Sequence, residues 1–317
     1  MLLLNEQEVR DLLPMNECVD VLDAAFAEWA AGSVSNMPRY RLPLMRGAQQ
    51  VMAGMSNDAG ATGLKTYVTG TQGPSSMVVL LFSTEDGSPL AMLAANALGQ
   101  IRTGAASGVA TRHIARSDAN TVAIIGSGYQ ARTQLAAVAA VRPIERALVY
   151  SRNPERREAF AQRMSQSLGI DVRPAESAHD AVAGSAIVCA ITNSREPVFD
   201  GESLAPGTHV NAAGSNHWMR REVDETTIRR SDIVVVDDLE DAKVECGELI
   251  WAAERRAFRW ENAVELRDVV SGRVAGRPSP EAITLFESQG LAMEDVTAGM
   301  HIYRKALESG VGREVEL

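Results

Sequence analysis

Residues 121–131 read TVAIIGSGYQA, and this stretch decides the fold of the chain. A run of β-branched and apolar residues breaks at Gly126, Ser127 and Gly128 and reaches the small residue Ala131. This spacing is the G-x-G-x-x-G/A pattern of dinucleotide binding. One glycine makes the tight turn from strand to helix, the second lets the backbone approach a pyrophosphate, and the third small residue lets the helix pack on the strand. The N-terminus of that helix then faces the anion.

The segments that follow complete a β-α-β unit. A helix is predicted over residues 130–141, and the second strand over residues 146–151, which read RALVYS. Glycine-rich turns after strands are common, so the pattern gains its weight from this context. We therefore expect a Rossmann half in which six turn residues bind the cofactor: Gly126, Ser127, Gly128, Tyr129, Gln130 and Ala131.

The end of the second strand indicates which nucleotide is bound. An NAD enzyme tends to carry Asp or Glu there, which accepts a hydrogen bond from the ribose 2′-hydroxyl, whereas a basic or hydroxyl residue suits a 2′-phosphate. Here the chain carries Ser151 and Arg152. We expect a preference for NADP(H), with NAD(H) possible; the alternative is that Arg152 merely begins a loop.

Length and composition limit the class of protein. A chain of 317 residues with 45% hydrophobic content is long enough for two domains. The balance of 31 Lys and Arg against 41 Asp and Glu gives a net charge of −10, which makes nucleic acid and membranes poor partners. The apolar residues 1–4 are cut short by Asn5, and no run approaches the roughly 18 apolar residues of a membrane span. We expect a cytoplasmic protein.

The cysteines and histidines give little support to a metal site. Cys18, Cys189 and Cys246 lie far apart, each in an apolar or amphipathic stretch, so buried thiols are favoured over a disulfide. The five histidines show no H-E-x-x-H or paired spacing.

The residues before the glycine-rich turn predict helices followed by a sheet. Asn5 and Glu8 resemble a capping box, and Asn16 precedes a run of helical period that ends at Gly32. Asp86-Gly87 signals a hairpin turn between two strands. An antiparallel sheet is expected from five extended segments, residues 40–44, 50–55, 63–69, 77–83 and 90–94, before a helix over residues 97–115.

After the β-α-β unit the chain alternates between strands and helices. Strands are predicted at residues 172–174, 186–192, 208–213, 233–237 and 283–286. This alternation predicts an α/β fold with a doubly wound, mostly parallel Rossmann sheet. A final helix over residues 296–309 is expected to pack back on the first domain. The predicted division is an α+β substrate domain, residues 1–115 and 296–317, and a Rossmann domain, residues 116–295.

Lys65 is a candidate for acid-base chemistry. It lies in the segment GLKTYVTG, where strand alternation puts Lys65 and Tyr67 on one face. A single lysine in a strand is usually a solvated charge at a sheet edge. The alternative is a lysine beside bound substrate, where partial desolvation lowers its pKa and lets it exchange a proton near neutral pH.

Two arginines are candidates for binding a carboxylate. Arg39 lies in PRYRLP and Arg102 opens RTGAAS at a predicted helix. Arginine holds a carboxylate through two parallel hydrogen bonds, which suits an amino or imino acid substrate. Ion pairs at the surface remain the alternative.

Thr192, Asn216 and His217 are candidates at the ends of two predicted strands. Doubly wound folds bind their ligands at the carboxyl ends of strands. An amide cannot carry a proton in acid-base work, so Asn216 would orient a ligand or the cofactor. His217 is either a loop histidine or the titrating neighbour of Asn216.

At this point the chain resembles the ornithine cyclodeaminase/μ-crystallin family. The resemblance rests on motifs that run in the family's order along almost the whole chain: GLK at Lys65, IRTGAAS at 101–107, VAIIGSGYQA, VNAAGSN followed by RRE and Asp224, SDIVVVDD at 231–238, and SPEAITLFESQGLAMEDV. It implies a homodimer formed through the first domain, a nicotinamide cofactor and a small amino or imino acid substrate. It also implies an active-site lysine at Lys65 and substrate-carboxylate arginines at Arg39 and Arg102.

One departure from the family pattern limits the activity. Where the cyclodeaminases and alanine dehydrogenases of the family carry an aspartate, with Pro-Gly-Lys shortly behind, this chain has Asn216, His217 and Trp218. The leading hypothesis is therefore an NAD(P)H-dependent reductase of cyclic imino acids, a ketimine reductase, or a related amino-acid dehydrogenase. The alternatives are an ornithine cyclodeaminase, and a μ-crystallin-like protein that binds NADPH or another ligand without turnover.

Overall fold

The computed structural model describes residues 1–72 and 76–316, and these form two compact units. Unit 1 comprises residues 1–102 and 290–317, and unit 2 comprises residues 103–289. The predicted boundaries were 115/116 and 295/296. The division differs because helix α3, Asn96–Ile114, is continuous across residue 102 and the last helix begins before residue 296.

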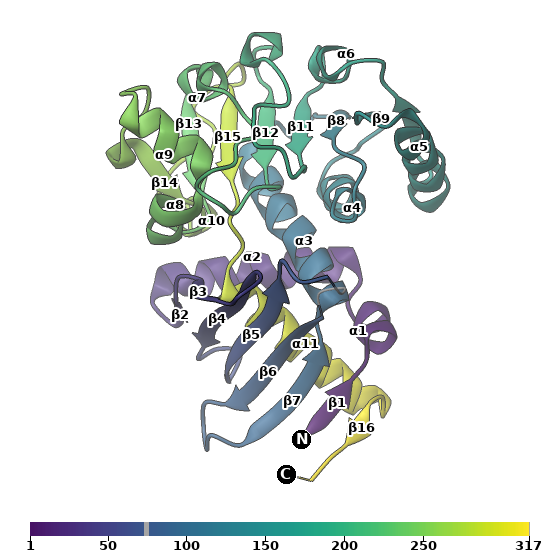
Figure 1. Cartoon of the computed structure of the whole chain (residues 1–317), viewed down its shortest axis with the longest axis vertical. Helices are drawn as coiled ribbons and strands as arrows, with labels where there is room; N and C mark the ends of the chain where they lie inside the picture. The colour runs from purple at the N-terminus through teal and green to yellow at the C-terminus, as the bar shows by residue number, and fades with distance from the viewer. Residues whose placement is uncertain (73–75, 317) are drawn as a thin grey trace. The chain divides into compact units, whose positions relative to one another are not determined.

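Unit 1 contains a mainly antiparallel sheet of the order β16-β1-β7-β6-β5-β4-β2, with β3 paired to β4 (Figure 1). The strands are β1 Leu2–Leu4, β2 Val34–Asn36, β3 Tyr40–Pro43, β4 Ala48–Ser56, β5 Ala61–Thr69, β6 Met77–Ser83, β7 Pro89–Ala94 and β16 Arg313–Glu314. The predicted turn between β6 and β7 is confirmed, and Gly87 adopts a φ of 74° there. The five extended segments expected from the sequence are all strands of this sheet.

Three helices belong wholly to unit 1: α1 Glu6–Leu12, α2 Met15–Ala31 and α11 Ala292–Ser309. The capping box of α1 is confirmed, because Asn5 accepts from the backbone of Glu8 and the Glu8 side chain accepts from the backbone of Asn5. The expectation that Asn16 precedes the second helix is wrong. Pro14 occupies the N-cap position of α2, since its fixed φ suits the entry to a helix.

Alternation along the strands gives the unit 1 sheet two unlike faces. Met52 on β4 and Lys65 on β5 are paired and buried on the face that α11 covers. A Cβ added to Gly63 would lie 3.2 Å from the Val296 side chain, which shows how closely α11 packs there. We call the opposite side the outer face. Its half-buried apolar residues are Val51, Leu64, Val68, Val78, Leu80, Phe82 and Met92.

Unit 2 is a doubly wound α/β domain, as predicted. Its eight strands are all parallel, in the order β10-β9-β8-β11-β12-β15-β13-β14. They are β8 Thr121–Ile125, β9 Arg146–Tyr150, β10 Asp171–Pro174, β11 Ile187–Ala190, β12 His209–Ala212, β13 Ile233–Val236, β14 Ala263–Glu265 and β15 Thr284–Glu287. The helices are α4 Ala131–Val141, α5 Pro154–Leu168, α6 Ala178–Val182, α7 Glu225–Arg230, α8 Leu239–Glu245, α9 Gly247–Glu254 and α10 Leu266–Val270, with short 3-10 turns η1 Gly201–Ser203 and η2 Trp260–Asn262.

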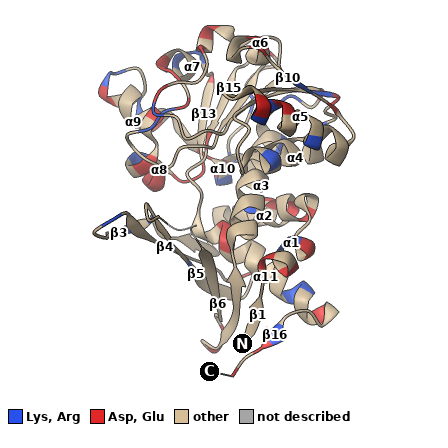
Figure 2. Ribbon diagram, turned by 45° about the vertical axis from the view of Figure 1, so that its right-hand side comes forward, with Lys and Arg blue, Asp and Glu red and all other residues tan. Residues whose placement is uncertain are grey.

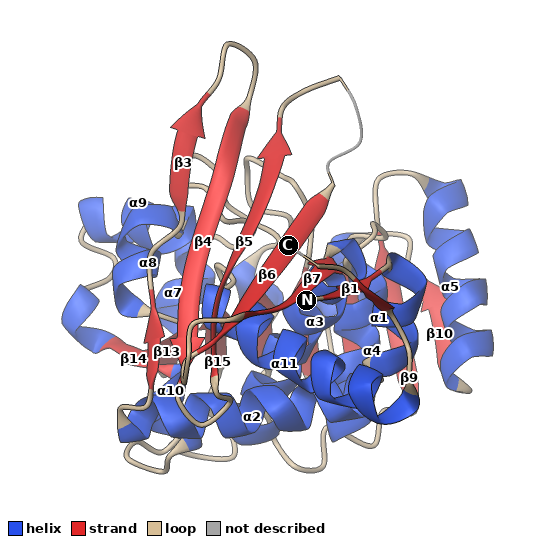
Figure 3. Ribbon diagram, turned by 90° about the horizontal axis from the view of Figure 1, so that it is seen from below, coloured by secondary structure: helices blue, strands red, loops and turns tan. Residues whose placement is uncertain are grey.

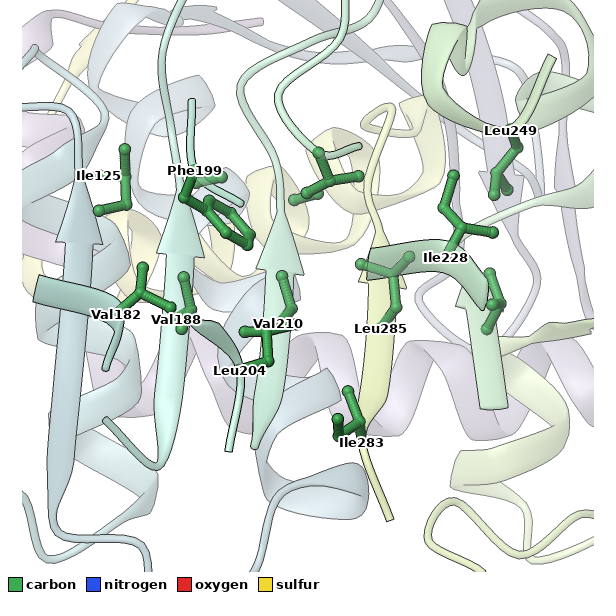
Figure 4. Close-up of a cluster of buried hydrophobic side chains, with 14 of the residues drawn as sticks. Ile125, Val182, Val188, Phe199, Leu204, Val210, Ile228, Leu249, Ile283 and Leu285 are labelled. Carbon is green, nitrogen blue, oxygen red and sulfur yellow. The ribbon is translucent and has the colours of Figure 1, made fainter. Parts of the chain in front are cut away.

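The unit 2 sheet is buried on both faces. One core cluster joins β8, β11, β12 and β15 to residues of the following loops and helices, among them Val188, Phe199, Val210 and Leu285 (Figure 4). A second cluster packs α4 and α5 against the other face of β8 and β9. The strand order reverses between β8 and β11, and the ligands of such folds bind at the carboxyl ends of the strands at this point. The glycine-rich turn follows β8, and therefore lies at the reversal.

No helix within the described ranges is long and apolar enough to cross a membrane.

Candidate active site

The turn after β8 has the geometry that a bound pyrophosphate requires. Gly126 has a φ of 117°, and a Cβ there would lie 2.5 Å from the carbonyl oxygen of Ile191. Only glycine fits both constraints. A Cβ on Gly128 would meet no atom within 4 Å, so the backbone is open there. Ala131 is buried at the first position of α4, where a larger side chain would push the helix from the strand.

The N-terminus of α4 fits an anion. Gln130 occupies its N-cap position, and no side chain makes a cap hydrogen bond. The first N–H groups of a helix lack partners within the helix, and here a phosphate could take them. Residues 126–131 therefore fit the diphosphate of a dinucleotide, which agrees with the role predicted for Ser127 and Tyr129; contact with a cofactor stays a prediction.

The end of β9 carries hydroxyl and basic groups. Ser127 Oγ donates to Ser151 Oγ at 2.8 Å, and Ser151 Oγ donates to the carbonyl of Asn153 at 3.2 Å. Asn153 caps α5 by accepting from a backbone N–H. Arg152 is exposed. The Arg157 guanidinium lies 5.6 Å from the centre of the Tyr150 ring and pairs with Glu176 at 3.3 Å.

Glu222 accepts hydrogen bonds from the residues that follow β11 and β12 and so links the carboxyl ends of these two strands. One of its carboxyl oxygens accepts from the backbone N–H of Thr192, and the other accepts from that of Gly214 at 2.7 Å. Burial raises the pKa of Glu222 to about 8, against the effect of these hydrogen bonds. Thr192 thus lies at the predicted strand end, held by a residue that the sequence analysis did not single out as functional.

The loop between Gly214 and Glu222 holds Asn216 and His217, both half-buried. His217 Nδ1 accepts from the backbone N–H of Met219 at 3.2 Å. The centres of the His217 and Trp218 rings lie 6.1 Å apart, with the two planes 20° from parallel. The carbonyl of Trp218 accepts from Trp251 Nε1 at 3.1 Å, which fastens the loop to α9. His217 therefore uses one ring nitrogen within its own loop. The catalytic role of both residues stays a prediction.

Lys65 is a buried, paired ammonium group in unit 1. Its side chain is 3% exposed, and its Nζ donates to Asp295 Oδ1 at 3.0 Å. Burial and the positive charge of Arg102 lower the pKa of Lys65, Asp295 opposes both effects, and the resulting pKa is about 8. A Cβ on Gly99 of α3 would lie 3.0 Å from this Nζ, so a glycine there leaves room for it. The alternative of a solvated edge charge is wrong.

Arg102 and Arg39 surround the same group. Arg102 Nε donates to Asp295 Oδ1 at 3.1 Å, and its Nη1 donates to Glu294 Oε2 at 2.7 Å. Arg39 Nη1 donates to the hydroxyl of Tyr67 at 2.6 Å, on the strand of Lys65. Lys65 also contacts Tyr67, because its Nζ lies 5.8 Å from the centre of the Tyr67 ring. The structure therefore brings the three residues predicted to bind substrate, Lys65, Arg39 and Arg102, close to one another. They lie beside Glu294 and Asp295, which were not predicted as site residues.

The acidic residues of this site come from one short sequence. Glu294 and Asp295 stand side by side at the start of α11, in the motif SQGLAMEDV that contributed to the family resemblance. If both are ionised, the three cations exceed the two acids by one charge. A net positive charge in a buried site favours a carboxylate ligand.

A further group of residues in unit 2 has spacing that could hold a metal ion. The ligand atoms of Cys246, Glu248 and Glu287 lie within 4.8 Å of one another, and all three side chains are buried. Burial raises the pKa of all three, of Glu248 to about 7. Their protonated forms are poor ligands, since metals bind thiolates and carboxylates. We assign no metal to this group.

The glycine-rich turn at the reversal of a parallel sheet defines unit 2 as a Rossmann dinucleotide-binding domain, and unit 1 carries a group of basic side chains paired with two buried acids. The profile of the ornithine cyclodeaminase/mu-crystallin family matches residues 1–310. The chain belongs to this family.

Similar proteins cover the chain from end to end. It is 36% identical to a Delta(1)-pyrroline-2-carboxylate reductase from Bacillus thuringiensis subsp. konkukian, over 100% of both chains. The solved structure of the Thermococcus litoralis Delta(1)-pyrroline-2-carboxylate reductase with NADH and L-proline has a TM-score of 0.95 and 38% identity, and covers 99% of this chain and 100% of that one. An archaeal alanine dehydrogenase dimer with bound NAD has a TM-score of 0.94 and 30% identity, covering 100% and 99%.

Proposed function

We propose that the protein is an NAD(P)H-dependent oxidoreductase that reduces cyclic imino acids such as pyrroline-2-carboxylate. The observation that carries this proposal is the group formed by the buried Lys65 and Arg102 with the half-buried Arg39, in a chain that matches imine reductases over its full length. A ketimine substrate has a carboxylate beside its C=N carbon. Guanidinium groups bind the carboxylate, and an ammonium group can protonate the nitrogen.

The reaction requires one hydride and one proton. The reduced nicotinamide, when bound, supplies the hydride to the carbon of the C=N bond. Lys65 gives its proton to the nitrogen, which balances the charge and leaves a cyclic amino acid and an oxidised cofactor. A pKa of about 8 suits Lys65 to this task, because it is still protonated at neutral pH and releases a proton readily. Arg39 and Arg102 orient the carboxylate.

The cofactor site supports a preference for NADPH. Ser151 and the exposed Arg152 follow β9 where a carboxylate would select NADH, and Arg157 adds a second guanidinium nearby. Three proteins of the family with similar structures were solved with NADH, NAD or NAD⁺. Titration of this protein with NADPH and with NADH tests whether it differs from them in its preferred cofactor.

The outer face of the unit 1 sheet supports assembly as a homodimer. Strands β4, β5 and β6 are almost free of charged residues (Figure 2); the exception is Lys65, which is buried on the face that α11 covers. The hairpin of β3 and β4 extends the sheet (Figure 3) and exposes Tyr40 and Leu42. The outer face is mainly apolar, with Gln49 and Thr66 among its polar residues, and a face of this kind favours an interface. A similar structure, the archaeal alanine dehydrogenase, is a dimer.

The test of the proposed reaction is consumption of NADPH and NADH by the purified protein. The substrates are pyrroline-2-carboxylate, piperideine-2-carboxylate, and pyruvate with ammonia or methylamine. Oxidation with either cyclic imine supports the proposal, and oxidation with pyruvate and an amine alone would make the protein an amino-acid dehydrogenase. If the protein binds the cofactor tightly but oxidises it with none of these substrates, the proposal is contradicted, and the protein is a nucleotide-binding protein without turnover.

A further inference from the structure

One carboxylate oxygen in unit 1 serves two cations that come from different elements. Asp295 Oδ1 accepts from Lys65 Nζ of β5 at 3.0 Å and from Arg102 Nε of α3 at 3.1 Å. The three side chains are 3%, 6% and 1% exposed for Lys65, Arg102 and Asp295, so water does not screen these contacts. The distance between the two cations is therefore set by Asp295.

We infer that Asp295 is a positioning residue of the proposed imine reduction, which holds Lys65 protonated and holds it at a fixed place beside Arg102. The inference rests on the proposed function of the site. Asp295 acts through Lys65, and no contact between Asp295 and the substrate is required.

The charges around Lys65 show why a carboxylate is needed there. Arg102 and Arg39 both disfavour the ammonium form, as does burial. Tyr67 presents its ring at 5.8 Å, and Glu294 bonds to Arg102. Asp295 is the acid in hydrogen-bond contact with Lys65 among the described residues. If its charge is removed, Lys65 loses the interaction that opposes burial and two positive neighbours.

The second oxygen of Asp295 supports a role beyond packing. Asp295 Oδ2 is buried and has no hydrogen-bond partner within the part of the chain that the structure describes. A buried acceptor without a partner destabilises the folded protein, so such atoms call for an explanation. A carboxylate kept for its charge on Lys65 and Arg102 explains why this cost is tolerated.

Glu294 offers a matched control. It is the neighbour of Asp295 on α11 and is equally buried. Its carboxylate accepts hydrogen bonds from Arg102 and from the backbone N–H of Leu291, and not from Lys65. Glu294→Gln therefore removes one buried acid from the site and leaves the Lys65–Asp295 pair. Asp295→Asn removes the charge that touches Lys65.

The first measurement observes Lys65 without turnover. The chain has only three lysines, Lys65, Lys243 and Lys305, so selective ¹³C-lysine labelling gives three sets of NMR signals. Lys65→Met assigns the signal of Lys65. In a pH titration of the full-length protein, Asp295→Asn should lower the pKa of Lys65 by about one unit or more, the size typical of losing an adjacent opposite charge. Glu294→Gln should move it less.

The second measurement is the pH profile of kcat and KM with pyrroline-2-carboxylate. Because the protonated lysine is the active form, activity falls on the alkaline side, and Asp295→Asn should move this limb to lower pH by the same amount. At a pH above the new limb kcat should fall about tenfold for each unit, while KM changes less, since Glu294 still holds Arg102. Glu294→Gln should raise KM and leave the limb in place. Asp295→Glu, which keeps the charge, should restore the limb toward that of the unaltered protein.

An unmoved pKa of Lys65 in Asp295→Asn, or an equal shift in Glu294→Gln, would overturn the inference. Should the unaltered protein reduce no imine, the proposed function fails, and the NMR titration still decides whether Asp295 sets the ionisation of Lys65. If Asp295→Asn does not fold, its spectrum shows it, and Asp295→Glu then carries the test: a Lys65 pKa far from the one measured in the unaltered protein would count against the inference.

Discussion

The hydroxyl groups of Ser127 and Ser151 lie 2.8 Å apart, which joins the glycine-rich turn after β8 to the residue that follows β9. One of these segments fits the diphosphate and the other lies where the adenosine ribose binds in Rossmann folds. The hydrogen bond therefore fixes the spacing between two parts of the proposed cofactor site, and it leaves the next residue, Arg152, exposed.

The first prediction concerns the choice of cofactor. NADPH should bind more tightly than NADH, and Arg152→Asp should erase or reverse this preference, because a carboxylate repels the 2′-phosphate and accepts from a free 2′-hydroxyl. Arg163→Asp, the same charge change at an exposed site farther along α5, is the control. Equal dissociation constants for both cofactors in the unaltered protein would contradict the prediction.

The second prediction concerns Lys65. Lys65→Met should lower kcat by at least the roughly 10²-fold typical of a lost general acid, because a thioether has no proton to give. Affinity for NADPH should hardly change, and the protein should fold, since Arg102 still pairs with Asp295. Lys243→Met, which removes an exposed lysine, provides the control. A Lys65→Met protein that keeps most of its activity would exclude Lys65 as the proton donor.

The third prediction separates imine reduction from cyclodeamination. Converting ornithine to proline needs oxidation, ring closure, loss of ammonia and reduction, so several protons must move in one site. An aspartate at position 216 could accept and return them, whereas Asn216 cannot. We expect measurable reduction of cyclic imines and little proline from L-ornithine with catalytic NAD⁺. Robust proline formation would mean that His217 or another group relays the protons.

The fourth prediction concerns stability and pH. Glu222 has a pKa of about 8 in the folded protein against 4.5 as its ordinary value, so the folded state binds more protons than the unfolded state between these values. The free energy of unfolding should therefore fall as pH rises toward 8. His209 acts in the opposite direction, because burial lowers its pKa to about 3 from 6.5, but this effect is confined to pH values below 6.5.

The range from pH 6.5 to 8 thus isolates the buried acids. Thermal unfolding of Glu222→Gln should depend less on pH in this range than that of the unaltered protein, although Glu248 leaves part of the slope. Glu240→Gln, at an exposed acid of α8, should keep the full slope. Equal slopes in all three proteins would show that Glu222 is ionised throughout.

The fifth prediction concerns assembly. Leu80→Lys places a charge in the middle of the outer face of the unit 1 sheet, and should convert a dimer to a monomer in analytical ultracentrifugation. Leu307→Lys makes the same change at an exposed leucine of α11 and should leave the dimer intact. A monomeric unaltered protein, or a Leu80→Lys protein that stays dimeric, would remove the outer face as the interface.

Local patterns predicted most of the fold. The β-α-β unit around Gly126, the antiparallel sheet of unit 1 and the parallel sheet of unit 2 were all predicted from the periodicity of apolar residues and from turn residues a few positions apart. The start of the last helix could not be found in this way. It begins at Ala292, where Asn36, 256 residues earlier, accepts from its backbone N–H and Glu294 accepts from that of Leu291; the contact with Asn36 cannot be found from the local sequence.

The site was predicted only as far as single residues. The basic side chains Lys65, Arg39 and Arg102 are recognisable by their chemistry, but the burial of Lys65 depends on Asp295, which lies 230 residues away in sequence. Glu222 bonds two strand ends through backbone groups, and the RRE motif that contains it indicated the family and not this contact. The positions of such acids follow from the tertiary fold.

The three cysteines are free and buried, and burial raises the pKa of each thiol. Reagents that attack thiolates will therefore react only when the surrounding structure opens. Cys18 lies in unit 1, whereas Cys189 and Cys246 lie in unit 2. The rates at which a disulfide reagent labels each cysteine therefore measure local opening, and they distinguish the opening of unit 1 from that of unit 2 without an engineered cysteine.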